Sequence, residues 1–271
     1  MNRIIFFVSD STGITAETLG SALLTQFQDD QFDTHTLRYV NTEDKARSAA
    51  ETIRRVGKDY GTAPIIFSTL IDRELREIVS ECGGVFLDFF GSFIEPLENA
   101  IGQRASPTIG RSHSMETEVH YSDRMDAVNF ALTNDDGVST RQYGRAEIVL
   151  VGVSRTGKTP TCLYLALHYG IYAANYPLTE EDLNLARLPE PLHPHRSKLF
   201  GLTIDPHRLS EIRGGRRPDS RYASLQQCRF EVAQAETIFQ TCHVPRLNST
   251  AMSVEEIATS LMNRLGLKRH T

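Results

Sequence analysis

Short apolar runs alternate with helix-like stretches over the first hundred residues. Four runs have the length of buried strands, at positions 4–8, 34–40, 64–70 and 85–90. The stretches that follow them repeat apolar residues every three or four positions, which predicts helices over 14–27, from 42, from 72 and over 94–101. Such alternation predicts a parallel sheet with helices on both faces. We therefore expect residues 1–104 to form an N-terminal parallel-sheet α/β unit.

The first of these helices carries an apolar stripe. Ala16, Leu19, Leu23 and Phe27 recur at helical spacing. We expect this stripe to pack against the sheet.

A second α/β pattern begins at residue 146. Strand-like runs lie at 148–151, 171–174, 198–204 and 244–247. Helices are predicted over 159–169, from 209, over 221–239 and from 254, the last with Ser253 and Glu256 at the spacing of a capping box. The pattern is weak over 105–145, where only one helix near 126–133 is predicted. We therefore expect a connector over 105–145 and a second unit over 146–271.

A phosphate-loop motif follows the first strand of the second unit. The pattern G-x-x-x-x-G-K-[ST] is matched by Gly152, Val153, Ser154, Arg155, Thr156, Gly157, Lys158 and Thr159. The glycines allow backbone N–H groups to point at phosphate oxygens, and the helix that follows adds its positive end. Lys158 would supply a mobile positive charge and Thr159 a hydroxyl for Mg²⁺. The buried strand before the motif and the apolar helix after it disfavour an ordinary glycine turn. We expect a P-loop kinase-like α/β unit that binds a purine nucleotide.

Asp205 and a group of arginines follow the third strand of that unit. Asp205 could hold Mg²⁺ through water or accept a proton, or it could be a turn residue before Pro206. The arginines could close over the phosphates as a lid, or form a solvated basic face; they are Arg208, Arg213, Arg216, Arg217 and Arg221. The phosphate loop in the same unit favours the lid, and Arg213 and Arg217 are our catalytic candidates within it.

Two further turns carry candidate chemistry. Asp135, Asp136 and Gly137 could form a metal site, a pair of catalytic carboxylates or a plain turn, and their spacing alone favours the turn. Residues 9–13, with the sequence Ser-Asp-Ser-Thr-Gly, could bind a second anion at a helix start. A capped helix start is the simpler interpretation of that second turn.

Composition and charge limit the functional classes. The chain is 40% hydrophobic and 23% charged, which is typical of a globular protein, and its net charge is −5. Because proteins that bind nucleic acids are usually basic, this net negative charge disfavours a nucleic-acid-binding function. No apolar run approaches the length of a membrane span. The four cysteines lack metal or redox spacing and predict reduced thiols, so we expect a cytoplasmic protein.

Several long strings of the sequence resemble one protein family, the regulatory proteins of pyruvate, phosphate (or water) dikinases. The resemblance covers almost the whole chain, and the stretch 221–229 together with the Gly157-Lys158 pair is similar to the branch that regulates phosphoenolpyruvate synthase. The strings that carry it lie at 8–17, 135–137, 152–161, 173–177, 200–206, 220–224 and 254–258.

The resemblance implies an enzyme with two activities. One transfers phosphate from ADP to a threonine of the target dikinase and inactivates it. The other removes that phosphate with inorganic phosphate as the acceptor and releases pyrophosphate. The resemblance also favours Asp135 and Asp136 as residues that bind a metal or transfer a proton, over a plain turn. Lys158 would then lie against the β-phosphate of ADP.

Other functions stay open at this stage. The same chemistry could act on pyruvate, phosphate dikinase. A P-loop kinase that uses ATP on a small molecule, and a nucleotide-gated binding module without catalysis, are the further alternatives. The oligomeric state is also open, with a homodimer as one option.

Overall fold

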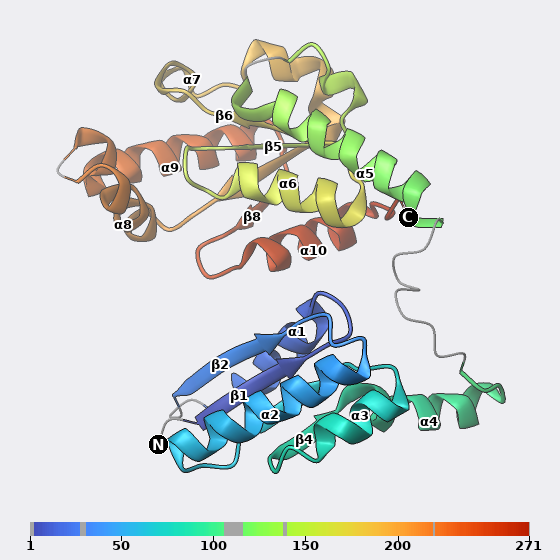
Figure 1. The fold of residues 1–271 in the computed structure, drawn as a ribbon. Coiled ribbons are helices and arrows are strands. Elements are labelled where there is room, and N and C mark those ends of the chain that lie inside the picture. Colours follow the sequence, from blue (N-terminus) through green and yellow to red (C-terminus); the bar gives the residue numbers. More distant parts are fainter. Residues whose placement is uncertain (1–2, 28–30, 106–115, 138–139, 219, 271) are drawn as a thin grey trace. The chain divides into compact units, whose positions relative to one another are not determined.

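The chain folds into two compact α/β units. The computed structural model describes residues 3–27, 31–105, 116–137, 140–218 and 220–270. The units comprise Met1–Ser114 and Met115–Thr271, and each contains one four-stranded, all-parallel sheet (Figure 1). The predicted fold class is therefore confirmed. The boundary falls inside the expected connector 105–145, because helix α5 (Glu116–Thr133) packs along a helix of the second unit.

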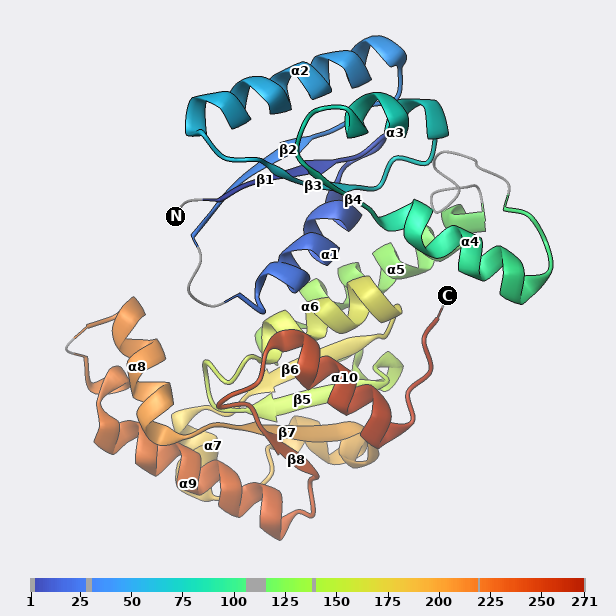
Figure 2. The same cartoon turned by 90° about the horizontal axis from the view of Figure 1, so that it is seen from below.

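The sheet of the first unit has the strand order β2-β1-β3-β4. Its strands are β1 (Arg3–Val8), β2 (Phe32–Leu37), β3 (Ile65–Ser68) and β4 (Val85–Asp88). Its helices are α1 (Ile14–Leu24), α2 (Glu43–Tyr60), α3 (Arg73–Ser80) and α4 (Phe89–Ile101). Figure 2 shows α2 and α3 on one face of the sheet and α1 on the other. The helices predicted from residues 42 and 72 begin as expected, with Thr42 and Asp72 as side-chain caps.

Helix α1 packs on the sheet through small residues, so the predicted apolar stripe is wrong for three of its four members. Leu19, Leu23 and Phe27 are 44%, 50% and 60% exposed, whereas Ala16 and Gly20 are buried. A Cβ atom at Gly20 would lie 2.5 Å from the ring of Phe7. The helix therefore lies so close to the strands that larger side chains have room only on its outer side.

The second sheet repeats the order of the first, as β6-β5-β7-β8. Its strands are β5 (Ile148–Gly152), β6 (Ala173–Pro177), β7 (Leu199–Thr203) and β8 (Arg246–Asn248). Besides α5, its helices are α6 (Lys158–Tyr169), α7 (Glu180–Leu185), α8 (Pro206–Arg216), α9 (Leu225–Thr241) and α10 (Val254–Leu265). The capping box of Ser253 and Glu256 is confirmed, whereas α7 was not predicted.

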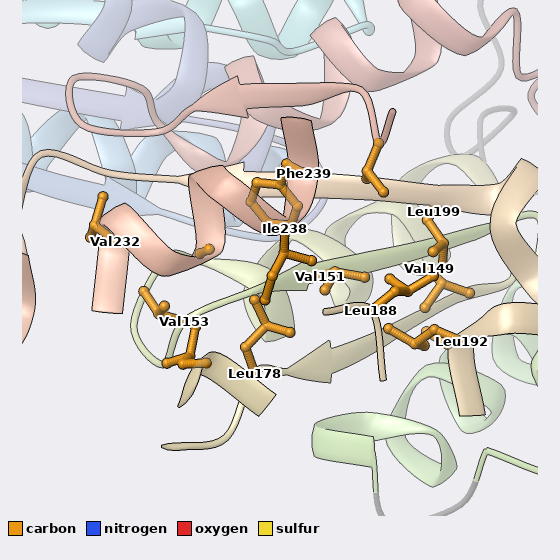
Figure 3. Packing of buried hydrophobic residues seen from close by; sticks show 14 of the residues in the cluster. Val149, Val151, Val153, Leu178, Leu188, Leu192, Leu199, Val232, Ile238 and Phe239 are labelled. Atoms are coloured by element: carbon orange, nitrogen blue, oxygen red, sulfur yellow. The ribbon is translucent and has the colours of Figure 1, made fainter. Parts of the chain in front are cut away.

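Two apolar clusters bury this second sheet. One lies on the α9 face and includes Val149, Val151, Ile238 and Phe239 (Figure 3). The other joins α5, α6 and α10 to the opposite face through residues such as Leu150, Leu165 and Leu261. All five residues of β5 are buried. The loop that follows β5 therefore leaves the most protected part of the unit.

None of the helices in the described part of the chain is both long enough and apolar enough to cross a membrane.

Candidate nucleotide site

The phosphate-loop motif forms a tight turn between β5 and α6. Gly152 ends the strand, where a Cβ atom would lie only 2.4 Å from the carbonyl oxygen of Leu202. Gly157 has a φ of +90° and precedes α6, which has no side-chain cap. The first N–H groups of an α-helix have no partner within the helix. The turn therefore presents the N–H groups and the positive end of α6 to an anion.

Hydrogen bonds within the protein hold this loop in shape. Arg155 adopts a φ of +76°, a conformation that costs a non-glycine residue energy. The hydroxyl of Thr156 donates to the carbonyl oxygen of Val153 at 3.1 Å. The hydroxyl of Ser249, which follows β8, lies 3.1 Å from the carbonyl oxygen of Thr156. Contacts within the protein alone therefore hold the loop in this conformation.

Lys158 places a buried amine beside the loop. Its side chain is only 4% exposed, and Nζ donates to the carbonyl oxygen of Val153 at 2.9 Å. Burial lowers the pKa of Lys158 to about 8, against the opposing effect of the Asp136 and Asp135 carboxylates. A bound phosphate would favour the charged amine and raise this pKa again.

Proton uptake should therefore accompany nucleotide binding at alkaline pH. With a pKa of about 8, only about a tenth of Lys158 carries its proton at pH 9, so ADP binding should take up close to one proton. Calorimetric titration at pH 9 in two buffers of different ionisation enthalpy measures this number. At pH 7 the amine is already charged and the uptake should be much smaller. Equal uptake at both pH values would show that Lys158 does not contact the phosphates.

An acidic turn from the α5 side meets the phosphate loop. Asp135 lies in the 3₁₀ turn Asp135–Gly137, and its Oδ1 accepts a hydrogen bond from the Thr159 hydroxyl at 2.8 Å. The same oxygen accepts from the Asn175 side-chain amide, and the backbone N–H of Asp136 donates to Asn175 Oδ1 at 3.2 Å. Asp135 and Asp136 therefore form a turn and also lie at the predicted site.

This arrangement suits a magnesium ion chemically. A carboxylate and a hydroxyl are hard oxygen ligands, which Mg²⁺ prefers. Within the described residues, no group of three or more His, Cys, Asp or Glu side chains could hold a metal. Mg²⁺ commonly takes one or two carboxylates and completes its shell with water and substrate phosphates. Thr159 and Asp135 could therefore provide the few protein ligands that such a magnesium site needs.

Asp205 caps helix α8 at the same sheet edge. Its Oδ1 accepts from the backbone N–H groups of His207 and Arg208 at 2.8 and 3.0 Å. Its own N–H donates to the Thr250 hydroxyl at 2.7 Å. The carboxylate is exposed and follows β7, the neighbour of β5. Asp205 therefore acts as a helix cap, which agrees with the interpretation as a turn residue. That it also holds Mg²⁺ or accepts a proton stays a prediction.

Arg213 and Arg217 occupy very different environments on α8. Arg213 is fully buried, whereas Arg217 is exposed beyond the last turn of the helix. The Arg213 guanidinium lies 2.7 Å from Glu231 on α9, 3.1 Å from the carbonyl oxygen of Ser154 and 4.1 Å from the centre of the Tyr222 ring. This differs from the expected arginine on a mobile lid, because Arg213 is fixed between α9 and the phosphate loop.

Three contributors to the site were not singled out by sequence reasoning. Asn175 supports Asp135 and Asp136, Ser249 supports the loop at Thr156, and the Tyr222 hydroxyl lies 2.9 Å from that of Ser154. Asn175 left a signal in the sequence, since it is a polar residue that follows two alanines of a buried strand. Ser249 and Tyr222 left none, because serine and tyrosine are common in loops and the sequence does not show that Ser249 is buried.

Comparison with known proteins identifies the relatives of this chain. The model of the kinase/pyrophosphorylase family matches residues 5–262. A protein of Marinobacter nauticus is 51% identical over 270 residues, with both chains covered completely. A protein of Hahella chejuensis is 50% identical over 270 residues, covering 100% of this chain and 99% of its own. Both carry the provisional name of phosphoenolpyruvate synthase regulatory protein. With this coverage and identity, the chain belongs to the kinase/pyrophosphorylase family.

Proposed function

We propose that this protein regulates phosphoenolpyruvate synthase through two opposed phosphoryl transfers. In the inactivating direction it moves the β-phosphoryl group of ADP to a threonine of the synthase. In the activating direction it moves that group from the phosphothreonine to inorganic phosphate and releases pyrophosphate. The observation that carries the proposal is the phosphate loop with the buried Lys158 beside Asp135 and Thr159. The names of the relatives supply the target.

The forward transfer needs charge neutralisation and an acceptor for one proton. The threonine oxygen forms a bond to the β-phosphorus, the bond from that phosphorus to the bridging oxygen breaks, and AMP leaves. Lys158 and the N–H groups at the start of α6 balance the charge on the transferring group. The hydroxyl proton passes to a carboxylate, for which Asp136 and Asp205 are the candidates.

The reverse transfer can use the same loop. An oxygen of inorganic phosphate attacks the phosphothreonine phosphorus, the bond to the threonine oxygen breaks, and that oxygen takes up a proton. The product is pyrophosphate, which resembles the diphosphate of ADP in charge and length. A loop built for one diphosphate therefore suits the other.

Mg²⁺ would be held by Thr159 and Asp135, and when bound it would neutralise charge on the diphosphate oxygens. Asn175 fixes the Asp135 carboxylate in position, and Asp136 N–H in turn binds Asn175. Arg213 stabilises the phosphate loop by donating a hydrogen bond to the carbonyl oxygen of Ser154. In this arrangement Arg213 is a positioning residue.

A transfer assay with purified proteins tests the proposal. Label at the terminal phosphate of ADP should move to a threonine of phosphoenolpyruvate synthase, and label from ATP should not. Unlabelled inorganic phosphate should then release labelled pyrophosphate from the modified synthase. Pyruvate, phosphate dikinase serves as the control target. Transfer from ATP alone, or to neither protein, would contradict the proposal and favour a kinase of small molecules.

A further inference from the structure

The serine that follows β8 lies against a carbonyl group of the phosphate loop. Ser249 Oγ is 3.1 Å from the carbonyl oxygen of Thr156 and also 3.1 Å from that of Thr203, the last residue of β7. A hydroxyl has only one proton to donate. The Thr203 carbonyl oxygen already accepts the backbone N–H of Ser249 at 2.8 Å. The hydroxyl proton is therefore needed more at Thr156.

The Thr156 carbonyl depends on this hydroxyl for its hydrogen bond. Among the residues that the structure describes, no second donor reaches it. In a helix the donor would be the N–H group four positions further along, but that residue is Pro160, which has none. Thr156 is only 2% exposed, and an unpaired buried carbonyl is costly. Ser249 therefore supplies a bond that neither the loop nor α6 provides.

The same bond fixes the direction of one peptide group. The peptide between Thr156 and Gly157 is trans, so its N–H points away from its carbonyl oxygen. While the oxygen is held by Ser249, the Gly157 N–H points to the opposite side. Arg213 acts on another peptide of the loop in the same way, because it donates to the carbonyl oxygen of Ser154 at 3.1 Å. Backbone N–H groups turned to one side form a concavity that binds anions.

Without the serine, glycine would leave this peptide free to rotate. Gly157 has a φ of +90°, and a Cβ atom placed there would meet only Ile257 within contact range, at 3.9 Å. Glycine adopts positive and negative φ about equally readily. The backbone at Gly157 therefore does not choose between the two orientations of the peptide, and the hydrogen bond to Ser249 does.

Ser249 is itself held firmly by its turn. The next residue, Thr250, accepts the backbone N–H of Asp205 on its hydroxyl at 2.7 Å, and its own N–H donates to Asn248 Oδ1 at 2.9 Å. Together with the bond from the Ser249 N–H to Thr203, these contacts tie the turn to the carboxyl end of β7. The hydroxyl therefore approaches the loop from a fixed position.

We propose that Ser249 is a positioning residue of the phosphate loop. Its hydroxyl holds the peptide between Thr156 and Gly157 so that the Gly157 N–H faces a bound diphosphate, and it touches neither the nucleotide nor the transferred group. The inference rests on the proposed function, in which this loop holds the diphosphate of ADP or pyrophosphate. Without the hydroxyl, the loop divides between two orientations of one peptide, of which only one binds.

Pyrophosphate binding to the full chain tests the inference. Ser249→Ala should weaken binding about tenfold, the effect of one hydrogen bond to a charged group. Calorimetric titration with pyrophosphate in the presence of Mg²⁺ measures the affinity. Ser249→Thr keeps the hydroxyl and should retain most of it. Ile171→Val is the control for lost stability, because it removes a buried methyl group before β6, at the opposite edge of the sheet, and should bind as the parent does.

The transfer assay distinguishes a misoriented peptide from a loss of folded protein. A peptide that rotates lowers the fraction of protein that can bind, which raises the apparent KM, and saturating ligand restores that fraction. Ser249→Ala should therefore raise the KM for ADP about tenfold, in line with the lost hydrogen bond, at close to the parent kcat. Loss of folded protein would instead lower kcat at an unchanged KM.

The orientation of the peptide can also be observed without ligand. The sequence contains only two Thr-Gly pairs, Thr12-Gly13 and Thr156-Gly157. Labelling threonine carbonyls with ¹³C and glycine amides with ¹⁵N therefore leaves two signals in a carbonyl-filtered NMR spectrum. In the free protein, Ser249→Ala should shift or broaden the Gly157 signal and leave the Gly13 signal in place. Saturating pyrophosphate should return the Gly157 signal to its position in the parent complex.

The outcomes separate this inference from the proposed function. Equal pyrophosphate affinity in Ser249→Ala and the parent overturns the inference, and so does a Gly157 signal that the substitution leaves in place or a lower kcat at unchanged KM. A parent protein that binds pyrophosphate but transfers nothing to the synthase contradicts the proposed function alone, and a tenfold weaker complex with Ser249→Ala then still supports the inference. A parent that binds no pyrophosphate overturns both.

Discussion

Replacing Arg213 with methionine should lower the free energy of unfolding by about 3–5 kcal/mol. The guanidinium is fully buried and donates to Glu231, to the carbonyl oxygen of Tyr222 and to that of Ser154. Methionine fills much of the volume but leaves the largely buried Glu231 carboxylate without its partner, and an uncompensated buried charge is costly. Urea unfolding at pH 7, followed by circular dichroism, measures the change.

Two further variants separate the ion pair from other effects of that substitution. Arg217→Met, at the exposed arginine four positions along, should change the unfolding free energy by about 0.5 kcal/mol or less. Glu231→Leu combined with Arg213→Met should recover part of the loss, because no charge is then left unpaired. An Arg213→Met protein of normal stability that has lost phosphoryl transfer would instead place Arg213 against the phosphates.

The burial of Arg213 shows where sequence reasoning stopped. Five arginines between residues 208 and 221 look alike in the sequence, and the motif beside them favours a phosphate role. What distinguishes Arg213 is Glu231, which lies 18 residues further on another helix. A pairing of that kind depends on how α8 and α9 pack, and no local pattern encodes it.

The fold was more accessible because its signals are local. Buried strands and amphipathic helices have characteristic periods, so their order predicted two parallel sheets. The first helix was misjudged because its contact uses Ala16 and Gly20, while the larger Leu19 and Leu23 lie outside. Hydrophobicity ranks leucine above glycine, whereas close packing of a helix on a sheet can demand the reverse.

The candidate site also has a part that the sequence predicts and a part that it does not. Its phosphate loop is contiguous and its chemistry follows from the order of eight residues. The contact between Asp135 and Thr159 joins residues 24 positions apart, and that between Asp135 and Asn175 joins residues 40 apart. The topology brings them together, because Asn175 lies on β6, directly beside β5. Sequence spacing could therefore name Asp135 as a candidate but not connect it to the loop.

Replacing Lys158 with methionine should reduce both proposed phosphoryl transfers about 10²–10³-fold, the usual cost of removing one preorganised charge from a transition state. The amine lies inside the loop that would hold either diphosphate. The fold should tolerate the change. Burial lowers the pKa of Lys158 from its usual value of 10.5 to about 8, so the unfolded chain binds the proton more tightly. Below pH 8 the charged lysine therefore costs stability, and Lys158→Met should be at least as stable as the parent.

Measuring both proposed transfers in Lys158→Met tests whether they use the same phosphate loop. Rates of label transfer from ADP and of pyrophosphate release should fall together, because the proposed mechanism uses one loop in both directions. Lys158→Arg is the matched control, since it keeps the charge but changes its shape and reach, and it should retain more of both rates than methionine. If Lys158→Met loses one transfer and keeps the other at the parent rate, the two reactions use different phosphate sites, and the proposal of one shared loop is wrong.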